Sequence, residues 1–196
     1  VYKRQQVHIV EFELEHIEGG GANYQRIKLP GAGSTLDSGF PELPTLSVHL
    51  AIPRQGGVEL SIINQEQSQI QQFMAYPVQQ GQQEEAPKSF VIDAAFYAGG
   101  TAYPATAVQC GDPMILRDFR IVNLLVNPFS YDPQTQTLTV NQEINLRLSY
   151  TSGPGLNELD GELTAGSLSF ARIYASMILN FADYRDLMYS NVPPRF

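Results

Sequence analysis

The stretch that decides the fold runs Asp112-Pro113-Met114-Ile115-Leu116-Arg117-Asp118-Phe119-Arg120 and continues through an apolar run to Asn127-Pro128-Phe129-Ser130-Tyr131-Asp132-Pro133. β-Branched and aromatic residues recur between Pro113 and Pro128, which predicts one long strand from Met114 to Val126. Proline, asparagine and aspartate then reverse the chain, because these residues favour turns. We therefore expect a long strand followed by a hairpin.

Short strands separated by turns extend outward from this stretch. Val10-Glu11-Phe12-Glu13-Leu14-Glu15 alternates strictly, which predicts a half-buried strand whose glutamates face water. Further strands are expected at residues 45–52, 58–62, 105–109, 137–140 and 144–148. Many short strands with turn residues between them are typical of a sandwich. The sequence predicts an all-β fold, an antiparallel, jelly-roll-like β-sandwich, over residues 1–155.

The pattern changes after residue 155. An acidic stretch leads into apolar residues at intervals of three and four, which predicts one amphipathic helix: Phe170, Ile173, Tyr174, Met177, Ile178, Phe181 and Tyr184. We expect residues 156–190 to form an acidic linker and a helix that packs on the sandwich or on a partner. Residues 191–196 contain Pro193-Pro194 and are expected to form an extended tail.

Composition narrows the range of partners. The chain has 196 residues, a net charge of −8 and only 16% charged residues. Binding to a phosphate backbone requires clustered Lys and Arg, so we expect no nucleic-acid partner. No apolar run approaches the length of a membrane helix, so we expect no membrane insertion. Val1 stands where an initiator Met would be, which indicates a chain processed or truncated at its amino end.

Catalytic chemistry is not indicated. Cys110 is the sole cysteine, and the histidines that could serve it as a base, His8, His16 and His49, lie on predicted strands, where polar edge positions are the favoured interpretation. The acidic stretch 157–162 lacks the alternating ligands of a calcium loop. We expect no enzyme activity, no metal and no cofactor.

Three charged residues interrupt the long predicted strand: Arg117, Asp118 and Arg120. Charges are costly to bury unless they are paired. On a strand Arg117 and Asp118 would point to opposite faces and could not bridge each other. Our hypothesis is that they pair with neighbours across the sheet or with a partner protein.

The order of several segments resembles the amino-terminal propeptide of gingipain-type cysteine peptidases, family C25. The segments are Tyr24 to Gly31, Gly39-Phe40-Pro41-Glu42-Leu43-Pro44, Gly111 to Arg120, Tyr131-Asp132-Pro133 and Ile178-Leu179-Asn180. Propeptides of this family are β-sandwiches that assist folding of the catalytic domain and keep it latent by lying over its active-site cleft. The resemblance implies a non-catalytic inhibitor and folding assistant whose partner is a cognate cysteine peptidase catalytic domain.

The resemblance also implies candidate site residues. A family loop that presents a basic side chain to the specificity pocket corresponds here to about residues 79–88. This stretch belongs to the second half of the glutamine-rich region from Gln65 to Lys88, and we interpret that half as a long exposed loop. Gln82, Gln83, Glu84 and Glu85 stand where arginine would be expected, and Lys88 is the basic residue nearby. Either Lys88 fills the pocket, or the pocket does not prefer Arg, or inhibition works by covering the cleft alone. A solvated insertion without function is the other interpretation.

Two further expectations follow from the resemblance. Arg195 resembles a processing position, with an ordinary linker as the alternative. Export by the type IX pathway of Gram-negative bacteria implies a secreted or periplasmic setting. The competing function is a carbohydrate- or surface-binding module. Such modules usually need exposed aromatic side chains, so the ten Tyr residues favour this function and the absence of Trp argues against it.

Overall fold

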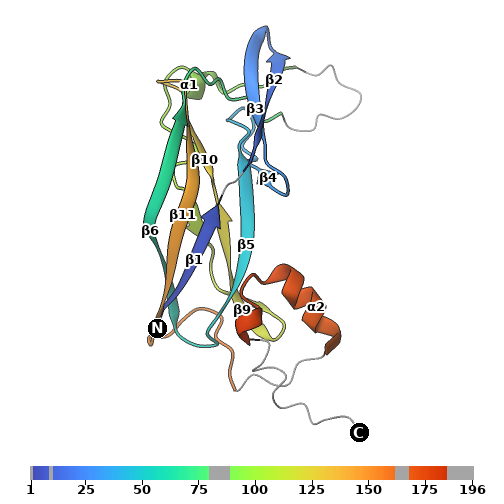
Figure 1. The fold of residues 1–196 in the computed structure, drawn as a ribbon, viewed down its shortest axis with the longest axis vertical. Helices are drawn as coiled ribbons and strands as arrows, with labels where there is room; N and C mark the ends of the chain where they lie inside the picture. The colour runs from blue at the N-terminus through green and yellow to red at the C-terminus, as the bar shows by residue number, and fades with distance from the viewer. Residues whose placement is uncertain (1, 9–10, 80–88, 162–167, 185–196) are drawn as a thin grey trace.

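The computed structural model describes residues 2–8, 11–79, 89–161 and 168–184. One sheet is built around β11 (Thr137–Thr151), which pairs along its length with β6 (Gly57–Ile70). On its other side β11 pairs first with β10 (Phe129–Asp132) and then with β1 (Tyr2–His8). All of these pairings are antiparallel, and Figure 1 shows β6 at the outer edge.

The second sheet is built around β9 (Phe119–Val126). On one side β9 pairs with β5 (Pro44–Ile52), and β5 pairs with the short β4 (Gly33–Ser34). On the other side it pairs in succession with β8 (Met114–Leu116) and β7 (Val108–Cys110). β2 (Glu13–Gly19) and β3 (Ala22–Lys28) form a separate two-stranded hairpin at one end of the molecule (Figure 1).

Two apolar clusters fill the sandwich, and a third lies beneath the carboxyl-terminal helix. The first cluster holds Phe73, Phe96, Phe129, Tyr131 and Leu138, at the end of the molecule where the short helix α1 (Ala94–Tyr97) lies. The second joins the sheets, with Leu50, Val122 and Leu124 facing Ile144, Leu146 and Leu148. The third packs helix α2 (Leu168–Met177) and the residues after it on the outer face of the second sheet. The predicted fold class is confirmed.

The long strand predicted from Met114 to Val126 is wrong. The chain turns at Arg117-Asp118, where Arg117 has a φ of +54°, and β8 folds back to pair with β9 from Leu116↔Phe119 onward. A turn at these residues keeps both charges near solvent, whereas a continuous strand would place one on each face of the sheet. Two short antiparallel strands therefore replace the predicted long one.

Other strands also differ from expectation. β6 continues to Ile70, well beyond residue 62, because an edge strand needs hydrogen bonds to β11 and not a buried face. Of the predicted exposed loop, Pro77 and Val78 are buried, and residues 80–88 lie outside the described part of the chain. β2 begins only at Glu13, and Leu14 is exposed, because the β2–β3 hairpin is a separate two-stranded ribbon. No helix within the described residues is long and apolar enough to span a membrane.

Candidate functional site

The candidate site is the outer face of the sheet that contains β5 and β9. Side chains alternate between the two faces of a strand. Ala51 and Ile121 are directly opposite each other and lie under α2, so His49 and Asn123, the next pair on the same face, also point outward. The following pair is Ser47 and Leu125. None of these four side chains is buried, so the face is open beyond the helix.

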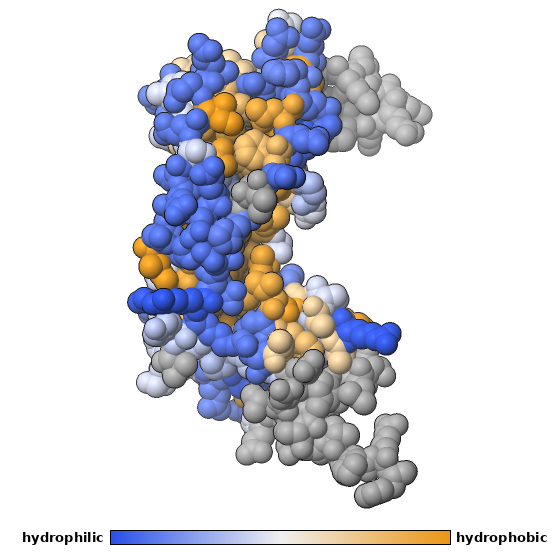
Figure 2. Space-filling view, viewed as in Figure 1, coloured by the Kyte–Doolittle hydropathy of each residue, from blue (hydrophilic) through white to orange (hydrophobic). Residues whose placement is uncertain are grey.

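Helix α2 and the residues after it cover one end of this face. Tyr174, Ile178 and Phe181 are buried against the sheet, and their rings and methyl groups meet Phe119 and Ile121. The opposite side of the same segment exposes Ile173, Met177 and Leu179, with Leu179 64% exposed. The helix therefore presents a second apolar surface to solvent (Figure 2).

The segment after α2 closes the free edge of β5. The backbone N–H of Leu179 donates to the carbonyl of His49 at 3.0 Å. The Asn180 side chain accepts from the Ala51 N–H at 2.8 Å and donates to the Ala51 carbonyl at 2.9 Å. An amide side chain here takes the place of a neighbouring strand. These bonds fix where the exposed Leu179 stands relative to the open face.

The other end of the face opens into a recess of about 520 Å³ beside β4. Leu36, Thr45, Gln109 and Leu125 are among its lining residues, and Leu36 is 78% exposed. Figure 2 shows the molecule hollowed between the hairpin end and the α2 end. An open polar strip thus runs between exposed aliphatic side chains at both ends.

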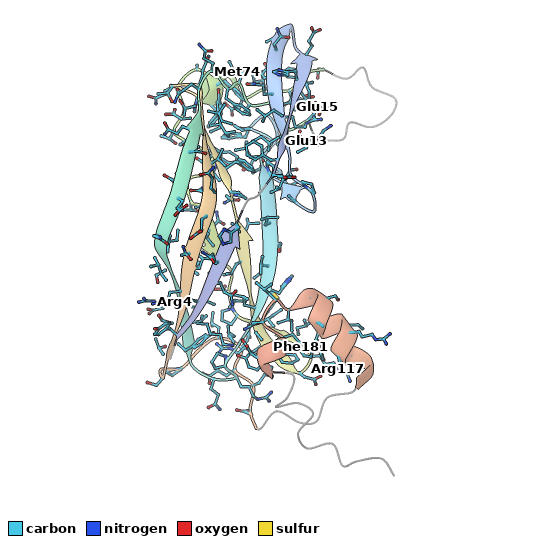
Figure 3. The ribbon with its side chains drawn as sticks, in the orientation of Figure 1. Arg4, Glu13, Glu15, Met74, Arg117 and Phe181 are labelled. Atoms are coloured by element: carbon cyan, nitrogen blue, oxygen red, sulfur yellow. The ribbon has the colours of Figure 1, made fainter. Side chains whose placement is uncertain are left out.

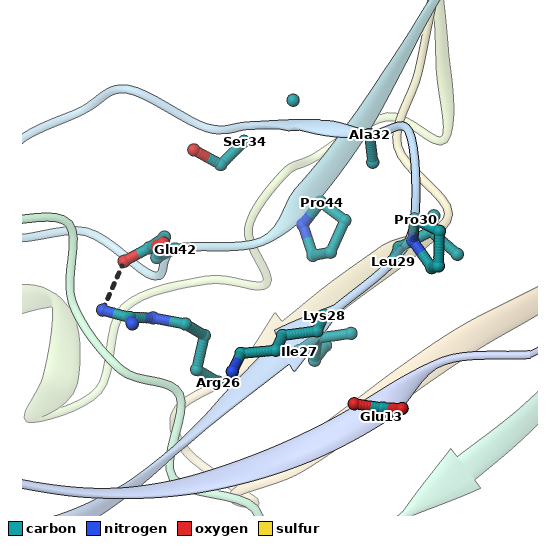
Figure 4. A pocket seen from close by; sticks show the side chains of 11 residues that line it. Glu13, Arg26, Ile27, Lys28, Leu29, Pro30, Ala32, Ser34, Glu42 and Pro44 are labelled. Carbon is teal, nitrogen blue, oxygen red and sulfur yellow. Dashed lines mark ion pairs between the residues drawn. The ribbon is translucent and has the colours of Figure 1, made fainter.

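A second recess, of about 550 Å³, lies between the hairpin and β4 (Figure 4). Both of its cations, Arg26 and Lys28, are already paired. Arg26 lies 3.2 Å from Glu42 and 3.6 Å from Glu15, and Lys28 donates to Glu15 at 2.9 Å. The hydrogen bond from Lys28 lowers the pKa of Glu15, so this carboxylate stays ionised beside the two cations. The cluster holds the hairpin and offers no unpaired cation.

The three predicted charges do not form one site. Arg117 and Asp118 do bridge each other, at 3.5 Å, because they occupy a turn and not the two faces of a strand. Their side chains also hold α2, since the Arg117 guanidinium lies 3.8 Å from the Phe170 ring centroid and the Tyr174 hydroxyl donates to Asp118 at 2.5 Å. Figure 3 shows Arg117 and Phe181 together at this end and Glu13 and Glu15 at the hairpin end.

Arg120 has a different environment. Its guanidinium is 1% exposed and donates to the carbonyls of Pro53, Gly56 and Leu156 at 2.7–3.0 Å. Burial lowers its pKa, an effect that nearby Glu158 partly offsets. Arg120 therefore connects two loops through their backbone and is not presented at the surface.

The remaining predicted site residues lie outside the described part of the chain. These are the loop candidates Gln82, Gln83, Glu84, Glu85 and Lys88 and the processing candidate Arg195. Cys110 is exposed as a residue, and partial desolvation of its thiol together with the nearby Asp112 carboxylate raises its pKa. A raised pKa reduces the thiolate fraction, which is the reverse of what a nucleophilic cysteine requires. No cluster of metal-ligating side chains occurs among the described residues.

Sequence reasoning missed the open face itself. Its one signal is Asn123, a polar residue in the otherwise apolar run from Ile121 to Val126. A polar residue with apolar neighbours on both sides indicates that one face of a strand is open. The pairing of Asn123 with Ser47, whose hydroxyl donates to its side-chain oxygen at 2.8 Å, joins residues too far apart in sequence to be anticipated.

Comparisons with known proteins agree on one family. The family model Propeptide_C25 matches residues 3–188. Gingipain R1 of Porphyromonas gingivalis is 28% identical over 153 residues, which cover 76% of this chain and 15% of that protein. Lys-gingipain of the same species is 27% identical over 150 residues, covering 71% of this chain and 9% of that protein. The chain thus spans only a small part of the length of these relatives.

Two solved structures share the fold. The complex of the Porphyromonas gingivalis RgpB pro- and mature domains matches with a TM-score of 0.79 and 21% identity, over 92% of this chain and 93% of that one. A structure concerned with the zymogenic latency of gingipain K from the same species matches with a TM-score of 0.65 and 22% identity, over 78% of this chain and 88% of that one.

Proposed function

The chain belongs to the C25 propeptide family, and on that basis we propose that it keeps a cognate gingipain-like cysteine peptidase latent by covering its active-site cleft. The chain itself is the non-catalytic part of such a zymogen. The observation that carries the proposal is the open outer face of β5 and β9, with exposed aliphatic side chains at both ends. We also propose that it assists folding of the catalytic domain.

The make-up of this face suits a protein partner. Apolar side chains that are exposed in a monomer and lie around a polar strip are typical of protein interfaces. Leu179 and Met177 stand at one end and Leu36 at the other, so a partner that spans the hollow contacts both. The structural relative described as a complex of pro- and mature domains supports a catalytic domain as that partner.

The segment 80–88 is proposed to enter the cleft. Phe90, two residues after it, lies against the turn of the β2–β3 hairpin, and its ring centroid is 5.4 Å from that of Tyr24. If Lys88 fills the specificity pocket, Lys88→Ala should weaken inhibition by roughly 2–5 kcal/mol, the cost of losing a buried charged contact. Unchanged inhibition would favour coverage of the cleft without an anchor.

A titration of the chain into the cognate catalytic domain tests the proposal. We expect stoichiometric loss of peptide hydrolysis. Leu179→Arg should raise the inhibition constant about tenfold or more, because it places a charge in the apolar end of the interface. Ile63→Arg is the matched control, since Ile63 is exposed on β6 in the other sheet and should leave the constant unchanged. Full activity in the presence of excess chain would exclude the inhibitory role and favour a surface-binding module.

Two parts of the proposal concern processing and location. Cleavage after Arg195 would release the propeptide, and amino-terminal sequencing of the mature peptidase tests this position directly. Secretion through the type IX pathway is proposed from the family, and fractionation of cells that lack this pathway tests it.

A further inference from the structure

A row of three hydrogen-bond donors crosses the outer face of the first sheet. The register places Arg4 of β1 directly opposite Arg147 of β11, and Arg147 directly opposite Ser61 of β6 (Figure 3). The neighbours of Arg147 along the strand, Leu146 and Leu148, are buried in the cluster between the sheets. Because side chains alternate between the faces of a strand, the three donors point away from the core.

The two arginines of this row have no acidic partner among the residues that the structure describes. Like charges directly opposite each other on neighbouring strands destabilise a sheet. The Nε of Arg147 is also buried, and no described residue accepts a hydrogen bond from it. The Arg4–Arg147 pair therefore carries two positive charges that the described part of the fold leaves uncompensated.

The ring of Tyr2 keeps these two charges beside each other. Its centroid lies 4.9 Å from the guanidinium carbon of Arg147 and 5.8 Å from that of Arg4. The face of an aromatic ring attracts cations, but it does not replace the oxygen acceptors that guanidinium N–H groups bind in ion pairs. The two guanidiniums are thus held close together with N–H groups available to an incoming anion.

Acidic side chains on the same face are engaged elsewhere or unpaired with the arginines. Glu143 lies two rows away, where its carboxylate is 3.5 Å from His8 Nδ1 and accepts a hydrogen bond from Asn145. Glu59 lies one row away from Arg147 and forms no ion pair with it.

Most other described cations do have partners. Carboxylates lie beside Lys3, Arg26, Lys28 and Arg117, and backbone carbonyls accept from Arg54 and Arg120. On a chain with a net charge of −8, acidic partners are abundant. Two adjacent arginines without such a partner are therefore exceptional in this part of the chain and indicate a ligand that is anionic.

We propose that Arg4, Arg147 and Ser61 form a binding site for a phosphate monoester. Such a group carries a charge close to −2 and three strong acceptor oxygens, so one group can compensate both guanidiniums, whereas one carboxylate compensates a single charge. Guanidinium forks bind phosphate oxygens in pairs. The Ser61 hydroxyl lies 3.5 Å from the Arg147 carbonyl, too far for a strong bond, and can donate to a third oxygen.

This site lies on the outer face of the first sheet, whereas the proposed peptidase interface lies on the outer face of the second sheet. The two surfaces can therefore be occupied together, and the phosphate site does not depend on the proposed inhibitory function. An open sheet face admits a phosphate monoester that is free in solution or one that is the headgroup of a lipid.

A titration of inorganic phosphate into the full chain at constant ionic strength, followed by the NMR signals of the arginine Nε–H groups, tests the site. We expect saturable shifts for Arg4 and Arg147. Arg4→Gln and Arg147→Gln should each raise the dissociation constant about tenfold, because each removes charged hydrogen bonds to the anion. Arg172→Gln is the matched control, since Arg172 is exposed on α2, away from this face, and should leave the constant unchanged.

Melting temperatures separate binding from a purely structural role of the pair. Without phosphate, Arg4→Gln should melt no lower than wild type, because the substitution removes repulsion between like charges. Phosphate should raise the melting temperature of wild type more than that of Arg4→Gln or Arg147→Gln, since a ligand that binds only the folded state stabilises it. A structural role would instead lower the melting temperature in both variants and leave the dissociation constant at the wild-type value.

Two probes distinguish the sources of the phosphate. Saturation by inorganic phosphate without binding to vesicles supports a soluble ligand. Binding to phosphatidylcholine vesicles only when they contain phosphatidic acid, with loss of binding in Arg4→Gln and Arg147→Gln, supports a lipid headgroup.

Two results would overturn the proposal. One is that acetate at the same ionic strength shifts the arginine signals with the same dissociation constant as phosphate, which would exclude recognition of a phosphate. The other is that Arg4→Gln and Arg147→Gln bind both probes as well as Arg172→Gln does, which would exclude these arginines as the site.

Discussion

At the scale of single residues, Arg120 shows how the structure accommodates a buried charge that contacts no carboxylate within the described part of the chain. Carbonyls of Pro53, Gly56 and Leu156 accept its hydrogen bonds and hold two loops together. We predict that Arg120→Ala lowers the free energy of unfolding by about 3 kcal/mol, because buried carbonyls lose charged partners. Arg120→Lys should recover little of this, since an ammonium cannot reproduce the planar fork. Denaturant unfolding measures both.

Arg117 provides the comparison for Arg120. It is exposed in the β8–β9 turn and contributes a contact to the Phe170 ring and an ion pair with Asp118. Arg117→Ala should therefore cost about 1 kcal/mol or less. If Arg120→Ala and Arg117→Ala lowered the free energy of unfolding equally, the distinction between a buried arginine that joins two loops and an exposed one would be wrong.

Glu158 should make stability depend on pH. Its carboxylate accepts from the N–H groups of Gly56 and Gly155, both at 2.8 Å, and these bonds lower its pKa. A lowered folded-state pKa adds stability above the unfolded value, and this is lost as the pH falls through the folded value. We predict that the melting temperature of Glu158→Gln lies below that of wild type at pH 7 and approaches it below about pH 4. A constant difference across this range would exclude the charge as the cause.

At the scale of elements, α2 and its extension have two sides with different roles. Ile178 is 1% exposed and packs on the second sheet, whereas the adjacent Leu179 is 64% exposed. Ile178→Ala should lower the free energy of unfolding by about 3 kcal/mol, because it leaves a cavity under the helix. Leu179→Ala should cost about 0.5 kcal/mol or less.

Functional measurements should rank these two variants in the reverse order. Leu179→Ala should weaken binding of the catalytic domain more than Ile178→Ala does under conditions in which both variants are folded. If the loss of binding were instead larger in Ile178→Ala, the less stable variant, Leu179 would not be an interface residue.

The elements also show what a sequence pattern can and cannot predict. Helical spacing predicted one helix from Phe170 to Tyr184, but α2 ends at Met177 and the chain turns at residues 179–181. The predicted apolar stripe also covers two surfaces, because Ile173 and Met177 face solvent. The part of β6 beyond residue 62 was not predicted. It is stabilised by its pairing with β11, and its sequence carries no alternation of apolar and polar residues. The β8–β9 turn was not predicted, because Arg117 and Asp118 were placed on a continuous strand.

The candidate site was less predictable than the fold. Resemblance to a family indicated the segment 80–88, which lies outside the described residues, whereas the open face depends on the pairing of β5 with β9, at His49↔Asn123 and Ser47↔Leu125. No local pattern reports such contacts, since each is a backbone or amide hydrogen bond between distant residues. The motif that begins at Gly39 was visible in the sequence, and the structure gives its physical reason: Gly39 has a φ of +81°, and a Cβ there would lie 2.8 Å from the Asp93 nitrogen.

At the scale of the whole molecule, β11 runs through two apolar clusters and should make them unfold together. Leu138 lies in the cluster near α1 and Leu148 in the cluster between the sheets, and both are buried on this one strand. β6 pairs with β11 beside both residues, at Leu138↔Ile70 and Leu148↔Leu60. Separate unfolding of either end would therefore break a continuous ladder, which favours a single cooperative transition.

Leu138→Ala and Leu148→Ala test this cooperativity as a matched pair. Each should lower the free energy of unfolding by roughly 2–5 kcal/mol and shift the same transition, with an unchanged dependence on denaturant. Near-ultraviolet circular dichroism follows the tyrosines around Tyr131, which lie in the Leu138 cluster, and far-ultraviolet signal follows all strands. If Leu148→Ala unfolded the strands in part and left the tyrosine signal native, the two ends would be independent units. A shared transition would instead mean that a change in the cluster between the sheets is felt in the cluster near α1, so that the sandwich unfolds as one unit.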